Sequence, residues 1–269
     1  MRILLVLTLL LLSPPLKALE QPWLILTEPF PPYFSPELPN NGWMHDLVAT
    51  ALTNQGINVT IEYVAWSRAM RLTASGGAVA ALGAYKSVQR EQRYYYSKAI
   101  GKTDTGFFGK STLALTTPLQ LDDLKKYVIA KGEEYVVVEG FEDHPDLSFT
   151  ETVDLITSLH MLLGGRVDLV AGTKQVGEYW LHHHPKFTER PESSSINFIE
   201  PALATQKMYM IFGKVQDGND IRVKQFNKAI ADFVWSGELS TLLTRHLLPE
   251  AERQSIITLL QEQFEKPNY

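Results

Sequence analysis

The chain has 269 residues, of which 45% are hydrophobic and 20% are charged, and its formal net charge is -5. This composition is typical of a globular protein with one large or two modest domains, and an acidic balance without a basic stripe argues against nucleic acid as a partner. The sequence has no cysteine, which excludes disulfides, thiolate catalysis and cysteine-based zinc sites.

The first residues have the pattern of an export signal. Arg2 supplies a positive charge, residues 3–12 form an apolar run, and a Ser-Pro-Pro sequence ends it. The run is too short to cross about 30 Å of hydrocarbon as a helix. We therefore predict a signal peptide over residues 1–18, cleaved after Ala18, and a soluble mature chain in the periplasm without membrane insertion. The alternative is a buried first helix.

The first half of the mature chain alternates between short apolar strands and helices. Prolines within residues 29–39 forbid a regular helix after the first strand. Ser67 is the expected N-cap of the second helix, which Gly76 and Gly77 end. The expected strands are residues 23–27, 59–64 and 79–83, and the expected helices are residues 46–55 and 67–74.

The second half repeats this alternation. Gly132 is expected to open a turn into another helix, and residues 221–235 have the spacing of an amphipathic helix. Strands that alternate with helices predict an α/β protein with largely parallel sheets. The other expected helices are residues 121–126 and 152–163, and the other expected strands are residues 127–130, 167–171 and 208–213.

A series of short motifs runs along nearly the whole mature chain. In order, they are EPFPPY at 28–33, GWMHDL at 42–47, AWSR at 65–68, GAYKSVQR at 83–90, YYS at 95–97, GRVD at 165–168, FNKAI at 226–230 and SGEL at 236–239. Each motif alone is weak, but their order and spacing resemble family 3 of the extracellular solute-binding proteins, the amino-acid-binding type.

This resemblance implies a two-lobed periplasmic-binding-protein fold in which each lobe is a mostly parallel sheet flanked by helices. Two strands would cross between the lobes, near residues 105–110 and 205–210. Lobe 1 would combine residues 19–107 with 208–269, and lobe 2 would comprise residues 108–207. The two lobes would close on a ligand by a hinge motion.

The implied function is the capture of a small polar, amino-acid-like molecule that carries a carboxylate, on behalf of an inner-membrane ABC permease. The resemblance implies a monomer without a cofactor. No metal site and no catalytic residue is expected.

Arg90 is the leading candidate for ligand contact. The family places an arginine here to hold the ligand's carboxylate, which a guanidinium fork can bind through two parallel hydrogen bonds. The expected position is an exposed one at the rim of the cleft, so loss of Arg90 should hardly change stability without ligand. The alternative is a surface arginine on a helix shared with Gln89, Glu91 and Arg93.

Aromatic residues border the expected cleft. Tyr33 and Trp66 could form walls around a ligand or pack within a lobe. Tyr85 stands where many members of the family have a small serine or threonine, so its ring would shrink the pocket or add a wall. The turn from Gly83 to Ser87 is expected to offer backbone donors.

Three acidic or hydroxyl positions complete the expected site. Glu28, at the end of the first strand, could accept a hydrogen bond from a ligand amine or be a solvated turn residue. Thr173 stands where the family often has an aspartate for the ligand's amino group. Gly132, Glu133 and Glu134 replace a Gly-Thr-Thr turn, and acids there would repel a carboxylate.

These departures keep two other functions open. The first is an enzyme on the same scaffold, similar to cyclohexadienyl dehydratases, in which Glu28, Glu133 or Glu134 would be the acid. The second is a remnant or sensory accessory that binds nothing.

The His182-His183-His184 run is expected to be a surface loop rather than a metal site, because adjacent side chains do not converge on one ion.

Overall fold

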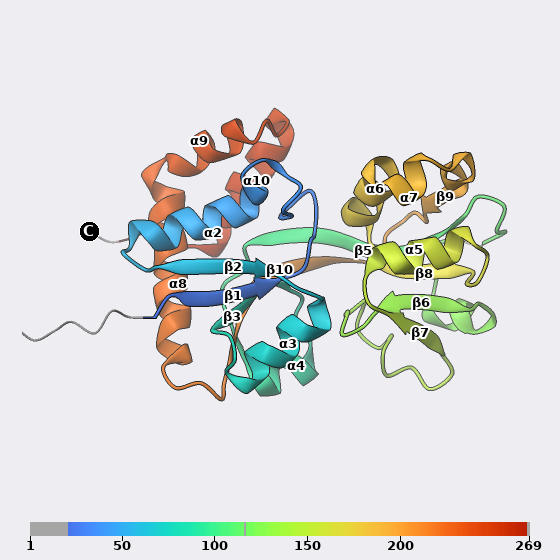
Figure 1. Ribbon diagram of the computed structural model, residues 1–269, viewed down its shortest axis with the longest axis horizontal. Coiled ribbons are helices and arrows are strands. Elements are labelled where there is room, and N and C mark those ends of the chain that lie inside the picture. Colours follow the sequence, from blue (N-terminus) through green and yellow to red (C-terminus); the bar gives the residue numbers. More distant parts are fainter. Residues whose placement is uncertain (1–20, 116, 268–269) are drawn as a thin grey trace, which may run out of the picture.

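The computed structural model describes residues 21–115 and 117–267, so the predicted signal peptide lies outside the described residues. Figure 1 shows two lobes, one at each end of the long axis, joined by two long strands. No helix among residues 21–115 and 117–267 has both the length and the apolar composition needed to cross a bilayer.

Lobe 1 contains the N-terminal strands and the C-terminal helices. Its strands are β1 (Trp23–Thr27), β2 (Val59–Tyr63), β3 (Ala80–Ala84) and β4 (Tyr94–Tyr96). Its helices are η1 (Pro39–Asn41), α2 (Trp43–Asn54), α3 (Trp66–Ser75), α4 (Val88–Arg93), α8 (Asn219–Ser236), α9 (Glu238–Arg245) and α10 (Glu250–Gln263).

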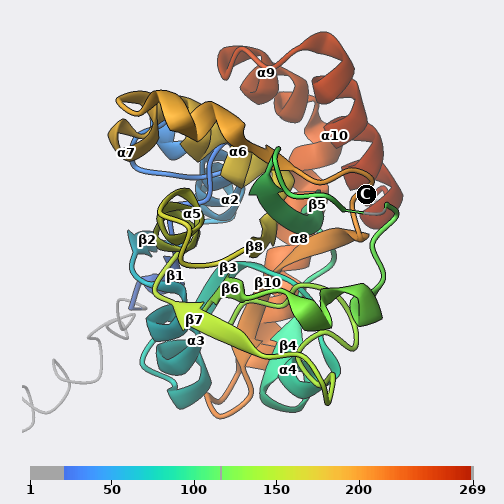
Figure 2. The same cartoon turned by 90° about the vertical axis from the view of Figure 1, so that its right-hand side faces the viewer.

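Lobe 2 contains the middle of the chain. Both views place α6 and α7 above β6 and β7 (Figures 1 and 2). Its strands are β6 (Ile129–Gly132), β7 (Phe149–Thr152), β8 (Leu169–Thr173) and β9 (Ile196–Phe198). Its helices are η2 (Leu121–Lys126), α5 (Leu155–Leu163), α6 (Lys174–His183), α7 (Pro185–Thr188) and η3 (Pro191–Ser195).

Two long strands, β5 (Gly101–Lys110) and β10 (Ala204–Gly213), connect the lobes. They pair with each other near one end, and each then joins a different sheet: β10 pairs with β3 and β4, whereas β5 pairs with β8 and β9. The main hydrogen-bonded order is β2-β1-β3-β10-β5-β8-β6-β7. The predicted lobe limits, 19–107 with 208–269 and 108–207, stay a prediction.

Within the described chain, every antiparallel pair of named strands includes β5 or β10, and the pairs β1–β2, β1–β3, β6–β7 and β6–β8 are parallel. A chain that leaves lobe 1 along one strand and returns along another must set these two strands antiparallel. Helix α2 links β1 to β2, α3 links β2 to β3, and α5 links β7 to β8, whereas the irregular residues 133–148 link β6 to β7.

The burial of side chains in α8 agrees with most of the predicted amphipathic pattern of residues 221–235. In α8, Phe226, Ile230, Phe233 and Val234 are buried, as the spacing predicts, and α8 packs against α2. Ile221, which the spacing placed near this stripe, is 56% exposed. Asn219 at the start of α8 is also buried and donates to the carbonyl oxygen of Gly213 at 2.8 Å, so the helix is held at both ends and only Ile221 turns to solvent from the predicted stripe.

Two local predictions are wrong. The helix after Gly132 does not form: Glu134 takes a left-handed conformation with φ 63°, and residues 135–137 have no regular secondary structure. The Tyr-Val-Val-Val sequence that follows is aromatic and β-branched, which disfavours a helix. Ala65, not Ser67, occupies the N-cap position of α3, and no side chain caps the helix there.

The histidine run is not a loop. His182 and His183 end α6, where each ring Nδ1 lies within hydrogen-bond distance of a carbonyl oxygen four residues earlier, Glu178 at 2.6 Å and Tyr179 at 2.9 Å. His184 accepts from the backbone N–H of Lys186 at the start of α7. The three rings therefore form hydrogen bonds at the ends of two helices.

Candidate functional site

A small cavity lies between the lobes, bordered by the end of β1, the β3–α4 turn, the segment after β6 and the end of β8. Its volume is about 30 Å³, which is room for one or two water molecules and not for a solute. The cleft is therefore closed in this structure. Residues from both lobes line it, among them Glu28, Trp66, Tyr85, Arg90, Tyr135 and Thr173.

Arg90 lies inside this cleft and is 4% exposed, so the expected rim position is wrong. Ser87 caps α4 by accepting the backbone N–H of Arg90, which fixes the start of the short helix and turns the guanidinium inward. Arg90 Nη1 donates to the carbonyl oxygen of Tyr85 at 2.8 Å, and Nη2 donates to the carbonyl oxygen of Glu134. Arg90 therefore joins lobe 1 to lobe 2.

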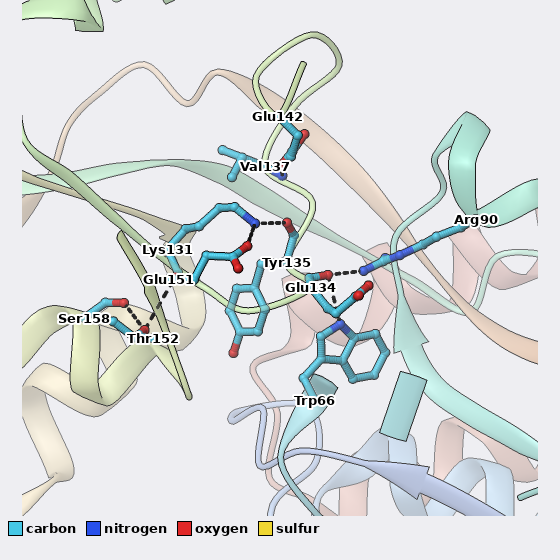
Figure 3. A network of polar contacts seen from close by, with 10 residues as sticks. All are labelled: Trp66, Arg90, Lys131, Glu134, Tyr135, Val137, Glu142, Glu151, Thr152 and Ser158. Atoms are coloured by element: carbon cyan, nitrogen blue, oxygen red, sulfur yellow. Dashed lines mark hydrogen bonds and ion pairs between the residues drawn. The ribbon is translucent and has the colours of Figure 1, made fainter. Parts of the chain in front are cut away.

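Trp66 meets the same carbonyl group. Its indole Nε1 donates to the Glu134 oxygen at 3.3 Å, and its ring lies 5.7 Å from the guanidinium carbon of Arg90 (Figure 3). Two donors from lobe 1 thus converge on one oxygen of lobe 2. An arrangement of this kind suits a carbonyl or carboxylate oxygen.

Tyr85 forms a second link between the lobes. Its hydroxyl lies 2.7 Å from Thr103 Oγ1 on β5 and 2.7 Å from Thr173 Oγ1 at the end of β8. Burial raises the pKa of Tyr85 to about 12, so it stays a neutral phenol. The threonine at position 173 therefore binds a tyrosine of the opposite lobe, and Tyr85 shrinks the pocket.

Glu28 is 6% exposed and is not a solvated turn residue. Tyr135 donates its hydroxyl to Glu28 Oε2 at 2.7 Å. Burial raises the pKa of Glu28 to about 8, although this hydrogen bond acts in the opposite direction. The carboxyl group is therefore protonated at neutral pH.

The remaining predicted residues lie around the cavity or away from it. Gly83 borders it with φ 96°, and a Cβ there would lie 2.6 Å from the ring of Phe34, so the close approach requires glycine. Ser87 and Glu133 border outer grooves instead, and Glu133 is exposed. Tyr33 lines a separate groove of about 580 Å³.

Tyr135 is the residue that sequence reasoning missed. It follows the turn at Glu133 and Glu134 and enters the cleft from lobe 2. Its position was hidden because a helix was expected there. The aromatic and β-branched run beginning at Tyr135 was the signal against a helix.

Comparison with known proteins shows which solved structures share this fold. No family model matches the sequence, and no curated protein matches it. A histidine kinase sensor domain with similarity to periplasmic binding proteins matches with a TM-score of 0.71 and 16% identity, over 84% of this chain and 96% of that chain. The chain has the two-lobed fold of the periplasmic binding proteins. The predicted fold class is thus confirmed.

Two other structures of this fold are binding proteins. The arginine-, lysine-, histidine-binding protein ArtJ from Geobacillus stearothermophilus matches with a TM-score of 0.68 and 17% identity, over 87% of this chain and 100% of that chain. An ancestral arginine-binding protein bound to glutamine matches with a TM-score of 0.66 and 14% identity, over 92% of this chain and 99% of that chain. At these identities the likeness shows the fold alone.

Proposed function

We propose that this chain is a solute-binding protein of the family 3 type, which captures a small polar molecule in the cleft between its lobes. The observation that carries the proposal is the meeting of polar side chains from both lobes in one buried cleft. Arg90 and Trp66 reach Glu134 from one side, and Tyr85 reaches Thr173 on the other. Such contacts form only when the lobes close, as ligand capture requires.

The proposed ligand carries a carboxylate. Arg90 and Trp66 already place two donors on a single acceptor oxygen. A carboxylate would replace this neutral carbonyl and add charge to the contact with the guanidinium. In the present closed form there is no room for such a ligand, so binding requires the lobes to open first.

The proposed setting is the periplasm, reached through the signal peptide, with an ABC permease as the partner of the monomeric protein. The pattern of residues 1–18 supports export. The substrate-binding protein of an amino acid ABC transporter, which shares the fold at 16% identity, supports the choice of partner.

The test is a thermal-shift screen of amino acids and small carboxylates, followed by calorimetry on wild type, Arg90→Ala and Arg90→Lys. We expect Arg90→Ala to lose about 2–5 kcal/mol of binding free energy, roughly 30- to 4000-fold in affinity. Arg90→Lys should also bind more weakly, because an ammonium group cannot reproduce the planar fork. Arg93→Ala, on the exposed side of α4, is the control. Equal affinities in all four proteins would reject the carboxylate clamp.

One observation favours a second candidate, acid catalysis as in the cyclohexadienyl dehydratases. The pKa of Glu28, raised to about 8 by burial, keeps a carboxylic acid protonated inside the cleft. Incubation with prephenate or arogenate tests this function. Turnover by wild type that Glu28→Gln abolishes would establish it, and absence of turnover would leave solute binding.

A further inference from the structure

A short piece of lobe 2 fills the cleft. The carbonyl oxygen of Glu134 accepts hydrogen bonds from Arg90 and Trp66, and the hydroxyl of Tyr135 donates to Glu28. All three of these partners belong to lobe 1. Figure 3 shows the Glu134 carbonyl between Arg90 and Trp66, with Lys131 on the other side. The unit that lobe 1 holds consists of Glu134 and Tyr135.

Lys131 fixes this unit to lobe 2. It is 3% exposed, its Nζ donates to the carbonyl oxygen of Tyr135 at 3.1 Å, and its charge is balanced by Glu151 at 3.0 Å. The Tyr135 ring also packs tightly over Gly132, where an added Cβ would lie 2.7 Å from three ring atoms. Tyr135 therefore has a defined place in lobe 2 and would move out of the cleft with that lobe.

The chemistry of this unit is that of an N-acyl-tyrosine. Its acyl oxygen is the Glu134 carbonyl, its phenol is the Tyr135 side chain, and both groups are bound by lobe 1. When the lobes separate, Arg90 keeps its bond to the Tyr85 carbonyl within lobe 1, so the guanidinium stays held. Lobe 1 then offers the vacated positions to another molecule of the same chemistry.

We infer that the Glu134–Tyr135 unit is a built-in occupant of the cleft, and that the external ligand is an aromatic hydroxy compound with a carbonyl or carboxylate oxygen, which this unit imitates. The inference rests on the proposed function and names the ligand class. A ligand and Tyr135 would compete for Glu28, so the closed empty form lowers the apparent affinity of the protein.

The environment of Glu28 favours a phenol over a cation. In the closed form Glu28 is buried and its partner is the neutral hydroxyl of Tyr135, and burial raises the pKa of the Glu28 carboxyl group to about 8. A cationic ligand would require an ionised Glu28 and would bring a second positive charge toward Arg90. A neutral hydroxyl needs neither change.

The experiment is calorimetry with N-acetyl-L-tyrosine, N-acetyl-L-phenylalanine and N-acetyl-L-arginine on wild type, Tyr135→Ala and Tyr135→Phe. Removing the built-in occupant should let Tyr135→Ala bind N-acetyl-L-tyrosine about 10-fold or more tightly than wild type does. The phenylalanine analogue should bind Tyr135→Ala about 10-fold or more weakly than the tyrosine analogue, because it leaves Glu28 without a partner. Tyr95→Ala, which changes a tyrosine of lobe 1 outside the cleft, should behave like wild type.

Tyr135→Phe keeps the aromatic ring and is the variant to measure if Tyr135→Ala does not fold. It loses only the bond to Glu28 and should bind N-acetyl-L-tyrosine more tightly than wild type by about 5-fold or more. Equal binding of the tyrosine and phenylalanine probes, tighter binding of the arginine probe, or equal affinities of wild type and both variants would each overturn the inference. If other solutes from the screen bind and N-acetyl-L-tyrosine does not, the ligand class is wrong and the proposed function stands. If no solute binds wild type or the variants, the proposed function fails as well.

Discussion

At the scale of single residues, the cleft is a set of buried polar groups that satisfy one another. The Arg90 guanidinium donates to two backbone carbonyl groups, one in each lobe. The Glu28 carboxyl group stays protonated and accepts a hydrogen bond from the hydroxyl of Tyr135. A charge or an acid buried in this way is costly once a partner is removed. These residues therefore contribute to stability as well as to the proposed binding.

The burial of Arg90 predicts a loss of stability even without ligand. Arg90→Ala should reduce the free energy of unfolding by about 2–3 kcal/mol, because two carbonyl groups lose a charged donor. Arg93→Ala, which replaces an exposed arginine of the same helix, should change it by less than about 0.5 kcal/mol. Denaturant unfolding measures both. Equal values for the two variants would mean that the lobes do not close on Arg90 in solution.

Glu28 predicts a pH dependence of stability. Its pKa is about 8 in the folded chain against an ordinary value of 4.5, so between these pH values the folded state binds the extra proton. The stabilisation from this group is therefore complete below about pH 4.5 and is lost as the pH rises through 8. Across this window the wild type should lose up to about 1.4 kcal/mol per pH unit relative to Glu28→Gln. Denaturant titrations at pH 5, 6, 7 and 8 measure this difference, and parallel curves for the two proteins would contradict it.

At the scale of elements, the segment after β6 decides what the cleft contains. The turn at Glu133 and Glu134 leads Tyr135 across the gap, and Thr105 on β5 donates to the carbonyl oxygen of Val137 at 2.9 Å. The segment is thus attached to the strand that connects the lobes. Its conformation and the closure of the cleft depend on each other.

A substitution at Gly132 should separate the lobes. In Gly132→Ala the new Cβ would lie 2.7 Å from the Tyr135 ring, so the ring must leave its place and lose its bond to Glu28. Small-angle X-ray scattering should show a larger radius of gyration than for wild type. Gly164→Ala is the control in the same lobe, since the nearest atom to its Cβ is 3.5 Å away. A Gly132→Ala protein as compact as the control would show that Tyr135 does not hold the cleft closed.

At the scale of the whole molecule, β5 and β10 divide and join the two lobes. β10 pairs with β3 and β4 in lobe 1, β5 pairs with β8 and β9 in lobe 2, and the two strands pair with each other in between. A hinge motion must therefore occur within or beside these two strands. The cleft residues on either side then move as parts of rigid lobes. The contacts between lobes at Glu134, Tyr135 and Thr173 are among those that such a motion breaks.

Export is a further prediction for the whole molecule. The charged, apolar and proline-broken parts of residues 1–18 predict cleavage after Ala18. N-terminal sequencing of protein from the periplasmic fraction should begin at or near Leu19. Recovery of the intact chain from the cytosol alone would contradict the proposed localisation.

Much of the local structure followed from the sequence by itself. Strand β1 and helix η2 have the predicted limits, because short apolar runs and clear end signals are properties of neighbouring residues. The motif order also pointed to the fold and to Arg90, Trp66 and Glu28. The local pattern did not predict strand β5, since its glycines and polar residues give no clear alternation, and a crossing strand near residues 105–110 was expected only from the resemblance.

Only the tertiary structure decided what surrounds these residues. Glu28 and Tyr135 are 107 positions apart, and no periodicity within either segment records that they meet. The burial of Arg90 likewise depends on Glu134 arriving from the other lobe. Local sequence determined which groups could bind a ligand. The packing of one lobe on the other determined that the protein's own Glu134 and Tyr135 occupy the cleft, because burial and pairing are properties of contacts between distant segments.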